Sequence, residues 1–171
     1  MYDRVVDVPR LVHTYGIGEP LPHPALAAAR EKLSERYLPE LGEPFVTAGC
    51  CYYRDGTDSV AWHSDRRVRA RRPAGETPVG TVRSNCEAGD EADRIGRGDR
   101  EDTMVAIASV GDPRRLALRP HGGGTAVSFT MGHGDLLVMG GSCQRTWEHA
   151  VPKQAHAGPR VSVQFRPLDV F

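Results

Sequence analysis

Residues 52–65 are the stretch from which the whole chain is interpreted, and they read Y-Y-R-D-G-T-D-S-V-A-W-H-S-D. The turn-forming D-G-T-D run separates two segments, so we predict strands over Phe45–Tyr53 and Val60–Asp65 joined by a turn. Side chains alternate along a strand, which places His63 and Asp65 on one face, where an imidazole and a carboxylate can share one cation. An H-x-D pattern alone is common by chance, and a surface histidine beside a solvated aspartate is the usual alternative.

A third candidate ligand lies near the C-terminus. Residues 134–139, which read G-D-L-L-V-M, predict a buried strand, and the segment after it ends at His149, within W-E-H. Two histidines and one carboxylate on one face of an iron, with the other positions open, form the facial triad of non-haem Fe(II) oxygenases. His149 is therefore a candidate to complete a metal site with His63 and Asp65.

Residues 160–166 read R-V-S-V-Q-F-R and alternate between polar and apolar side chains. This alternation predicts a strand that carries Arg160 and Arg166 on one face and its apolar residues on the other. A guanidinium on an interior face is costly unless it meets an anion, and its planar fork suits a carboxylate. A dicarboxylate co-substrate would satisfy both arginines.

Taken together, these motifs resemble the AlkB-like dioxygenases, which use Fe(II) and 2-oxoglutarate to remove alkyl groups from nucleic-acid bases. The similarity covers residues 45–65 and 93–167, with the aromatic-R-D-G-x-D-S-V-x-W-H-x-D run, the histidine of W-E-H and the R-x-x-x-x-x-R spacing. It implies an Fe(II)- and 2-oxoglutarate-dependent dioxygenase that consumes O2. The resemblance assigns Fe(II) to His63, Asp65 and His149, and 2-oxoglutarate to Tyr53, Arg160 and Arg166.

The resemblance also implies a reaction, the oxidative demethylation of N-alkylated bases in DNA or RNA. 2-Oxoglutarate would be decarboxylated to succinate and formaldehyde released, with Arg160 on the distal carboxylate and Arg166 near the carboxylate at the metal. The base must reach the iron, so we expect a single-stranded or flipped-out nucleic acid as partner. The alternatives are a 2-oxoglutarate oxygenase acting on a protein or small molecule, a catalytically impaired nucleic-acid-binding relative, and a jelly roll whose candidate ligands lie apart.

Two features depart from the family pattern. Cys51 stands where the family has an asparagine that helps to hold the co-substrate, and a thiol is a weaker donor than an amide. Residues 66–92 separate the H-x-D motif from an R-I-G-R-G segment, and their composition cannot support a core, so we expect a disordered surface insertion. The alternative is that its arginines contact phosphates. If the break lies elsewhere, Asp93 restores the H-x-D junction.

The length of 171 residues indicates one domain over residues 1–171. The net charge is zero, so bulk electrostatics do not indicate a nucleic-acid binder. The four cysteines show no disulfide spacing and no apolar run reaches membrane-spanning length. We expect a cytoplasmic monomer with reduced thiols and no membrane partner. Because family members carry more chain before this point, we expect Met1 to be an internal start.

The remaining segments predict a mainly β fold, a double-stranded β-helix (jelly roll) with one or more flanking helices, because many short strands alternate with glycine-rich turns. An apolar stripe predicts one helix over Pro24–Tyr37, stopped by Pro39, that braces the outside of a sheet. Further strands are predicted over residues 104–110, 115–119 and 125–131. We expect Trp62 and Trp147 in the core rather than stacked on a base, and we leave three histidines out of the metal site: His121, His133 and His156.

Overall fold

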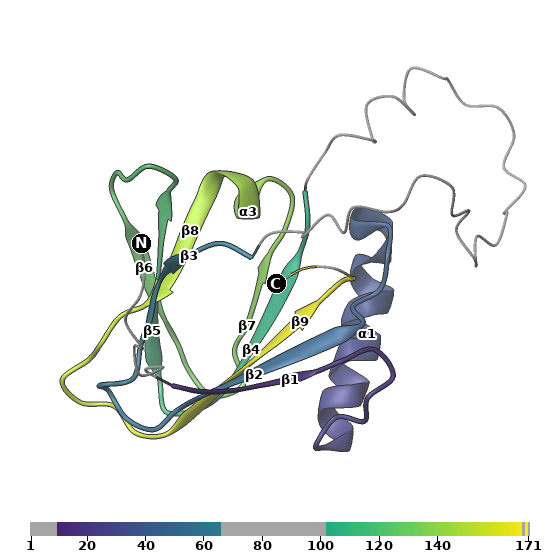
Figure 1. Cartoon of the computed structure of the whole chain (residues 1–171), viewed down its shortest axis with the longest axis horizontal. Helices are drawn as coiled ribbons and strands as arrows, with labels where there is room; N and C mark the ends of the chain where they lie inside the picture. The colour runs from purple at the N-terminus through teal and green to yellow at the C-terminus, as the bar shows by residue number, and fades with distance from the viewer. Residues whose placement is uncertain (1–9, 66–101, 169, 171) are drawn as a thin grey trace, which may run out of the picture.

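Short strands with glycine-rich turns build two antiparallel sheets in the computed structural model, which describes residues 10–65, 102–168 and 170 (Figure 1). The larger sheet has the strand order β1 (Leu11–Tyr15), β2 (Thr47–Tyr53), β9 (Arg160–Arg166), β4 (Val105–Gly111) and β7 (Leu136–Met139). The smaller sheet has the order β3 (Val60–His63), β8 (Trp147–Val151), β5 (Arg114–Pro120) and β6 (Val127–Met131). The predicted double-stranded β-helix is confirmed.

Alternation along β9 sorts its side chains between two environments, as the sequence predicts. Val163 and Phe165 are buried on the outer face of the larger sheet, whereas Ser162 and Gln164 turn towards the space between the sheets. That space holds the main apolar cluster, built from both sheets: Cys51, Tyr53, Val105, Ile107, Leu116, Met131, Met139, Val151 and Val170. A polar strand face therefore looks into the space that also holds the main apolar cluster.

Helix α1 (Pro24–Leu41) covers the outer face of the larger sheet, where Leu33 packs in one cluster with Phe165 (Figure 1). The helix begins as predicted, with Pro24 in the first turn and the His23 ring accepting a hydrogen bond from the Ala25 amide at 3.1 Å. The predicted stop at Pro39 is wrong. Pro39 has no amide hydrogen, so the carbonyl of the exposed Glu35 loses its helical hydrogen-bond donor, and no other carbonyl is affected. The helix therefore continues to Leu41 and ends at Gly42, which has a φ of 80°.

The turn before β3 is fixed by buried charge. The Asp58 carboxylate accepts hydrogen bonds from the backbone amide and the guanidinium of Arg54, at 2.7–2.9 Å. The guanidinium of Arg114, 1% exposed, donates to the carbonyl oxygens of Asp55 and Asp58 and to that of Pro152, which follows β8. Arg114 therefore joins the turn that starts β3 to the end of the neighbouring strand.

Strand β3 is shorter than predicted, since it ends at His63 and leaves Asp65 beyond the sheet. The register between β3 and β8 also shifts between Val60 and His63, so the two strands pair irregularly. The predicted insertion over residues 66–92, the alternative ligand Asp93 and the chain before Arg10 lie outside the described residues.

Among the described helices, none is long and apolar enough to cross a membrane. Cys50, Cys51 and Cys143 form no disulfide among the described residues. The cytoplasmic location and the monomeric state stay predictions.

Replacing Gly56 by alanine should loosen the turn that precedes β3. An added Cβ would lie 2.1 Å from the carbonyl oxygen of Gln154, whose own amide donates to the Gly56 carbonyl, so the backbone must move. We expect the free energy of unfolding to fall by about 2 kcal/mol, the range of overpacking in a closely packed site. Urea unfolding measures this, with Gly16→Ala as the control because its nearest atom is 3.8 Å away. Equal midpoints for the two variants would contradict the account of the turn.

Candidate metal centre

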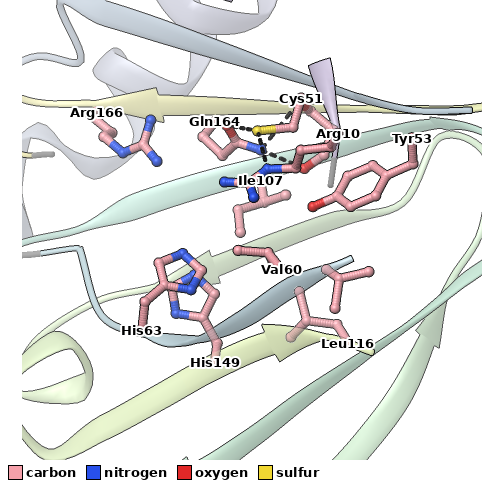
Figure 2. A pocket seen from close by; sticks show the side chains of 12 residues that line it. Arg10, Cys51, Tyr53, Val60, His63, Ile107, Leu116, His149, Gln164 and Arg166 are labelled. Atoms are coloured by element: carbon pink, nitrogen blue, oxygen red, sulfur yellow. Dashed lines mark hydrogen bonds between the residues drawn. The ribbon is translucent and has the colours of Figure 1, made fainter. Parts of the chain in front are cut away.

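Two histidines and one carboxylate meet between the sheets. His63 at the end of β3 pairs directly with His149 on β8, and their ring centroids lie 4.2 Å apart. Asp65 joins them from the segment after β3, and the candidate ligand atoms of the three residues all lie within 4.8 Å of one another. Figure 2 shows both imidazoles turned towards the same cavity. The structure thus brings together the three residues predicted to hold the metal.

The proton positions on the two imidazoles suit metal binding. The Nδ1 atom of His63 lies 2.8 Å from the Ala61 carbonyl oxygen, and because a carbonyl only accepts, Nδ1 carries the proton and Nε2 keeps its lone pair. Burial, followed by the neighbouring His63, lowers the pKa of His149 to about 4. His149 is therefore neutral at neutral pH, which is the form that ligates a metal.

The two oxygens of the Asp65 carboxylate differ in their hydrogen bonds. The Arg166 guanidinium donates to Oδ1 from Nε at 3.1 Å and from Nη2 at 2.8 Å. Oδ2 is buried without a hydrogen-bond partner among the described residues, 3.5 Å from His149 Nε2. A buried carboxylate oxygen with no partner is costly unless something cationic meets it. Two imidazoles and this oxygen fit the facial donor set of Fe(II).

A cavity beside the triad carries further polar groups (Figure 2). Burial raises the pKa of Tyr53 to about 12, so its phenol stays protonated as a hydrogen-bond donor. Arg166 lines the same cavity, together with Ser162 and Gln164 from β9. The thiol of Cys51 faces the cavity as well, 3.6 Å from Gln164 Oε1. Donors therefore surround a space next to the triad, which suits an anionic ligand.

Arg160 lies deeper than its predicted role suggests. It is 1% exposed, its Nε donates to the Ser109 hydroxyl at 2.9 Å, and its guanidinium carbon lies 5.4 Å from the centroid of the Tyr53 ring. It is outside the residues that line the cavity, but its Nη1 is buried with no partner in the described chain. A carboxylate beside Tyr53 would satisfy that group, and the contact of Arg160 with 2-oxoglutarate stays a prediction.

The sequence does not reveal three residues that contact the site. Arg10 reaches into the cavity, with Nε 3.4 Å from Cys51 Sγ, although it precedes a strand of exposed residues. Gln144 accepts a hydrogen bond from the Asp65 amide. Gly49 gives space to Arg166, because a Cβ there would lie 2.7 Å from Arg166 Nη1. No sequence pattern separates these residues from surface residues, since each acts through a contact between distant segments.

The predicted core positions of the two tryptophans are wrong. Trp62 is half-buried, and the Arg119 guanidinium lies 4.3 Å from its ring. Trp147 is also half-buried and lines a shallow hollow with Leu118 and Cys143. Trp147 lies two residues before His149, so alternation turns it to the same face as the metal candidate instead of the opposite one.

Comparison with known proteins adds evidence independent of this geometry. The family model described as the 2OG-Fe(II) oxygenase superfamily matches residues 90–166, which include His149, Arg160 and Arg166. The mouse protein named alpha-ketoglutarate-dependent dioxygenase alkB homolog 3 is 30% identical over 162 residues, covering 88% of this chain and 45% of its own. The Arabidopsis thaliana protein named DNA oxidative demethylase ALKBH2 is 34% identical over 116 residues, covering 67% of this chain and 35% of its own.

Among solved structures, a Pseudomonas putida prolyl-4-hydroxylase superposes with a TM-score of 0.53 at 15% identity, covering 91% of this chain and 71% of that one. This match supports the fold alone. The chain spans less than half the length of the mouse relative, 45%.

Acid should destabilise the metal-free protein through His149. Its pKa is about 4 in the folded chain and near 6.5 when unfolded, so the unfolded state binds more protons and stability falls as the pH drops from 6.5 towards 4. At 1.36 kcal/mol for each pH unit between the two values, the full loss is roughly 3 kcal/mol.

Urea unfolding at pH 7.5 and pH 4.5 checks this on the wild type and on His149→Gln, with His156→Gln as an exposed control. We expect His149→Gln alone to flatten the dependence on pH. An unchanged dependence in His149→Gln would show that another group is responsible.

Proposed function

Because the chain belongs to the 2OG-Fe(II) oxygenase superfamily, we propose that it removes alkyl groups from N-alkylated nucleic-acid bases oxidatively, using Fe(II), 2-oxoglutarate and O2. The observation that carries the proposal is the meeting of His63, Asp65 and His149, with Asp65 Oδ2 buried and without a partner among the described residues. The choice of substrate is supported by the similarity to an alkB homolog and to a protein named as a DNA oxidative demethylase.

The triad residues would hold iron through His63 Nε2, Asp65 Oδ2 and His149 Nε2. Bound iron supplies the redox chemistry: O2 oxidises 2-oxoglutarate to succinate and CO2, and its second oxygen atom enters a C–H bond of the N-alkyl group. The N-hydroxymethyl product of a methylated base then loses formaldehyde and leaves the unmodified base. Arg166 orients the Asp65 carboxylate, since both of its contacts go to Oδ1.

The cavity beside the triad suits a dicarboxylate. Tyr53 presents a protonated phenol, and Arg10 and Arg166 bring two guanidinium groups to its lining. Arg166 already pairs with Asp65, whereas Arg160 has a buried Nη1 with no partner in the described chain. A ligand with two carboxylates would meet donors at both ends, and the apolar residues Val60, Ile107 and Leu116 would exclude water from its middle.

The substrate base must leave its stack to reach a triad that lies between two sheets. Asp65 and His149 are 2% and 5% exposed, so a base inside a duplex cannot reach them without unstacking. We therefore propose a single strand or a flipped-out nucleotide as the substrate. The protein contributes placement and exclusion of water.

The test follows two products in one reaction. Full-length protein with Fe(II), 2-oxoglutarate and air is incubated with a single-stranded oligonucleotide that carries one 1-methyladenine or 3-methylcytosine. Mass spectrometry reports the oligonucleotide and chromatography reports succinate. We expect loss of the methyl group together with succinate, and a fall of at least about 1,000-fold in His63→Ala, because one of three ligands is missing. His156→Ala, which changes an exposed histidine, is the matched control.

The two products together distinguish the proposed function from its alternatives. Succinate without demethylation would refute the nucleic-acid substrate and favour an oxygenase that acts on a protein or small molecule. Oligonucleotide binding without either product would indicate a catalytically impaired relative.

The Cys51 position offers a second prediction. Cys51 faces the cavity, and replacing its thiol by the amide of asparagine adds a strong donor beside Gln164 and Tyr53. We expect Cys51→Asn to lower the KM for 2-oxoglutarate about tenfold with little change in kcat, the effect of one hydrogen bond to a charged group. Cys50→Ala is the control because Cys50 packs on the opposite face, towards α1. An unchanged KM would show that Cys51 does not contact the co-substrate.

A further inference from the structure

The metal candidate Asp65 is not positioned by its sheet. Strand β3 ends at His63, and the pairing of β3 with β8 that the structure shows involves only Val60 and His63. The backbone amide of Asp65 instead donates to the side chain of Gln144, with 3.0 Å between the Asp65 nitrogen and Gln144 Oε1. A side chain therefore takes the place that a neighbouring strand would otherwise occupy.

Gln144 belongs to the short helix α3 (Cys143–Thr146), which leads directly into β8. His149 lies five residues further along the chain, on that strand. One glutamine thus connects the segment that carries Asp65 to the segment that carries His149. The orientation of its amide is defined, because the N–H of Asp65 requires the oxygen and not the nitrogen of Gln144.

Gln144 is too buried to be a surface residue that meets Asp65 by chance. It is 2% exposed, and its Nε2 is buried with no hydrogen-bond partner among the described residues. A buried amide with half of its groups unsatisfied is costly, so an apolar residue would serve packing better here. The contact with the Asp65 amide is the feature that an apolar residue could not supply.

We propose that Gln144 is a positioning residue that, together with Arg166, aims the Asp65 carboxylate at the metal. Gln144 fixes the backbone of Asp65, Arg166 fixes Oδ1, and Oδ2 is left to face His149 at 3.5 Å. The identity of the metal rests on the proposed function. Without Gln144, the Asp65 amide loses its buried acceptor and the ligand segment moves away from His149.

Metal binding in the full-length protein tests this without turnover. Co(II) replaces Fe(II) as a probe stable in air, and titration calorimetry measures its dissociation constant in wild type, Gln144→Ala and Gln144→Glu. The matched control is Gln154→Ala, because Gln154 Oε1 also accepts a hydrogen bond from a backbone amide, that of Arg115 at 2.7 Å, away from the triad. Thermal unfolding of each metal-free protein reports stability separately.

Gln144→Ala should weaken Co(II) binding about 10- to 100-fold, the usual effect of removing a group that orients a metal ligand. Gln144→Glu keeps an acceptor for the Asp65 amide and should stay within about threefold of the wild type. Gln154→Ala should bind Co(II) as the wild type does.

The opposing outcomes are distinct. Wild-type Co(II) affinity in Gln144→Ala, whether or not its Tm falls, would refute the positioning role and leave the proposed function intact. If the wild type binds no Co(II), the metal centre is refuted and the role of Gln144 with it.

Discussion

The contact between Arg166 and Asp65 is the interaction on which the site depends. It joins β9 of the larger sheet to the segment after β3 of the smaller sheet, across 101 positions of sequence. Asp65 is 2% exposed, and a buried carboxylate needs a positive partner. Because Arg166 occupies only Oδ1, the same contact neutralises the charge in the metal-free protein and leaves Oδ2 for a cation. Folding and ligand placement are thus coupled through one side chain.

Several residues make sense only in relation to this contact. Gly49 lies beside β9 with no Cβ, which leaves room for the Arg166 guanidinium. Arg114 holds the turn before β3 to the chain after β8, and so brings His63 opposite His149. At the other end of β3, where strand pairing stops, Gln144 accepts a hydrogen bond from the Asp65 amide. The irregular pairing of β3 is therefore compensated at both of its ends.

The sequence could predict the fold from local patterns, and the candidate triad from local patterns together with the motifs of a known family. Alternation over Arg160–Arg166 separates the polar face of β9 from its apolar face, and the structure has the same separation. His63 and Asp65 lie two residues apart, so the sequence could place them near each other, but contacts with Gln144 and Arg166 position the Asp65 carboxylate. Predicting His149 as the third ligand also required the W-E-H motif, because spacing alone cannot show which strand pairs with β3.

The features that could not be predicted depend on tertiary contacts or on helix-end geometry. Nothing local shows that β3 stops at His63, since the register shift arises from pairing with β8. Pro39 reads as a helix stop, but at an exposed last turn the lost hydrogen bond costs too little to end the helix. Arg10 and Gln144 carry no motif, and only the folded chain brings them to Cys51 and Asp65.

The most direct test of the central claim is a crystal structure of the protein with Mn(II) and 2-oxoglutarate, with anomalous scattering used to locate the metal. We expect one metal peak about 2 Å from three ligand atoms, His63 Nε2, Asp65 Oδ2 and His149 Nε2. We also expect Arg166 to contact Asp65 Oδ1 still and the co-substrate to lie in the cavity beside Tyr53. A metal bound elsewhere, or held by the histidines while Asp65 points away, would refute this metal centre.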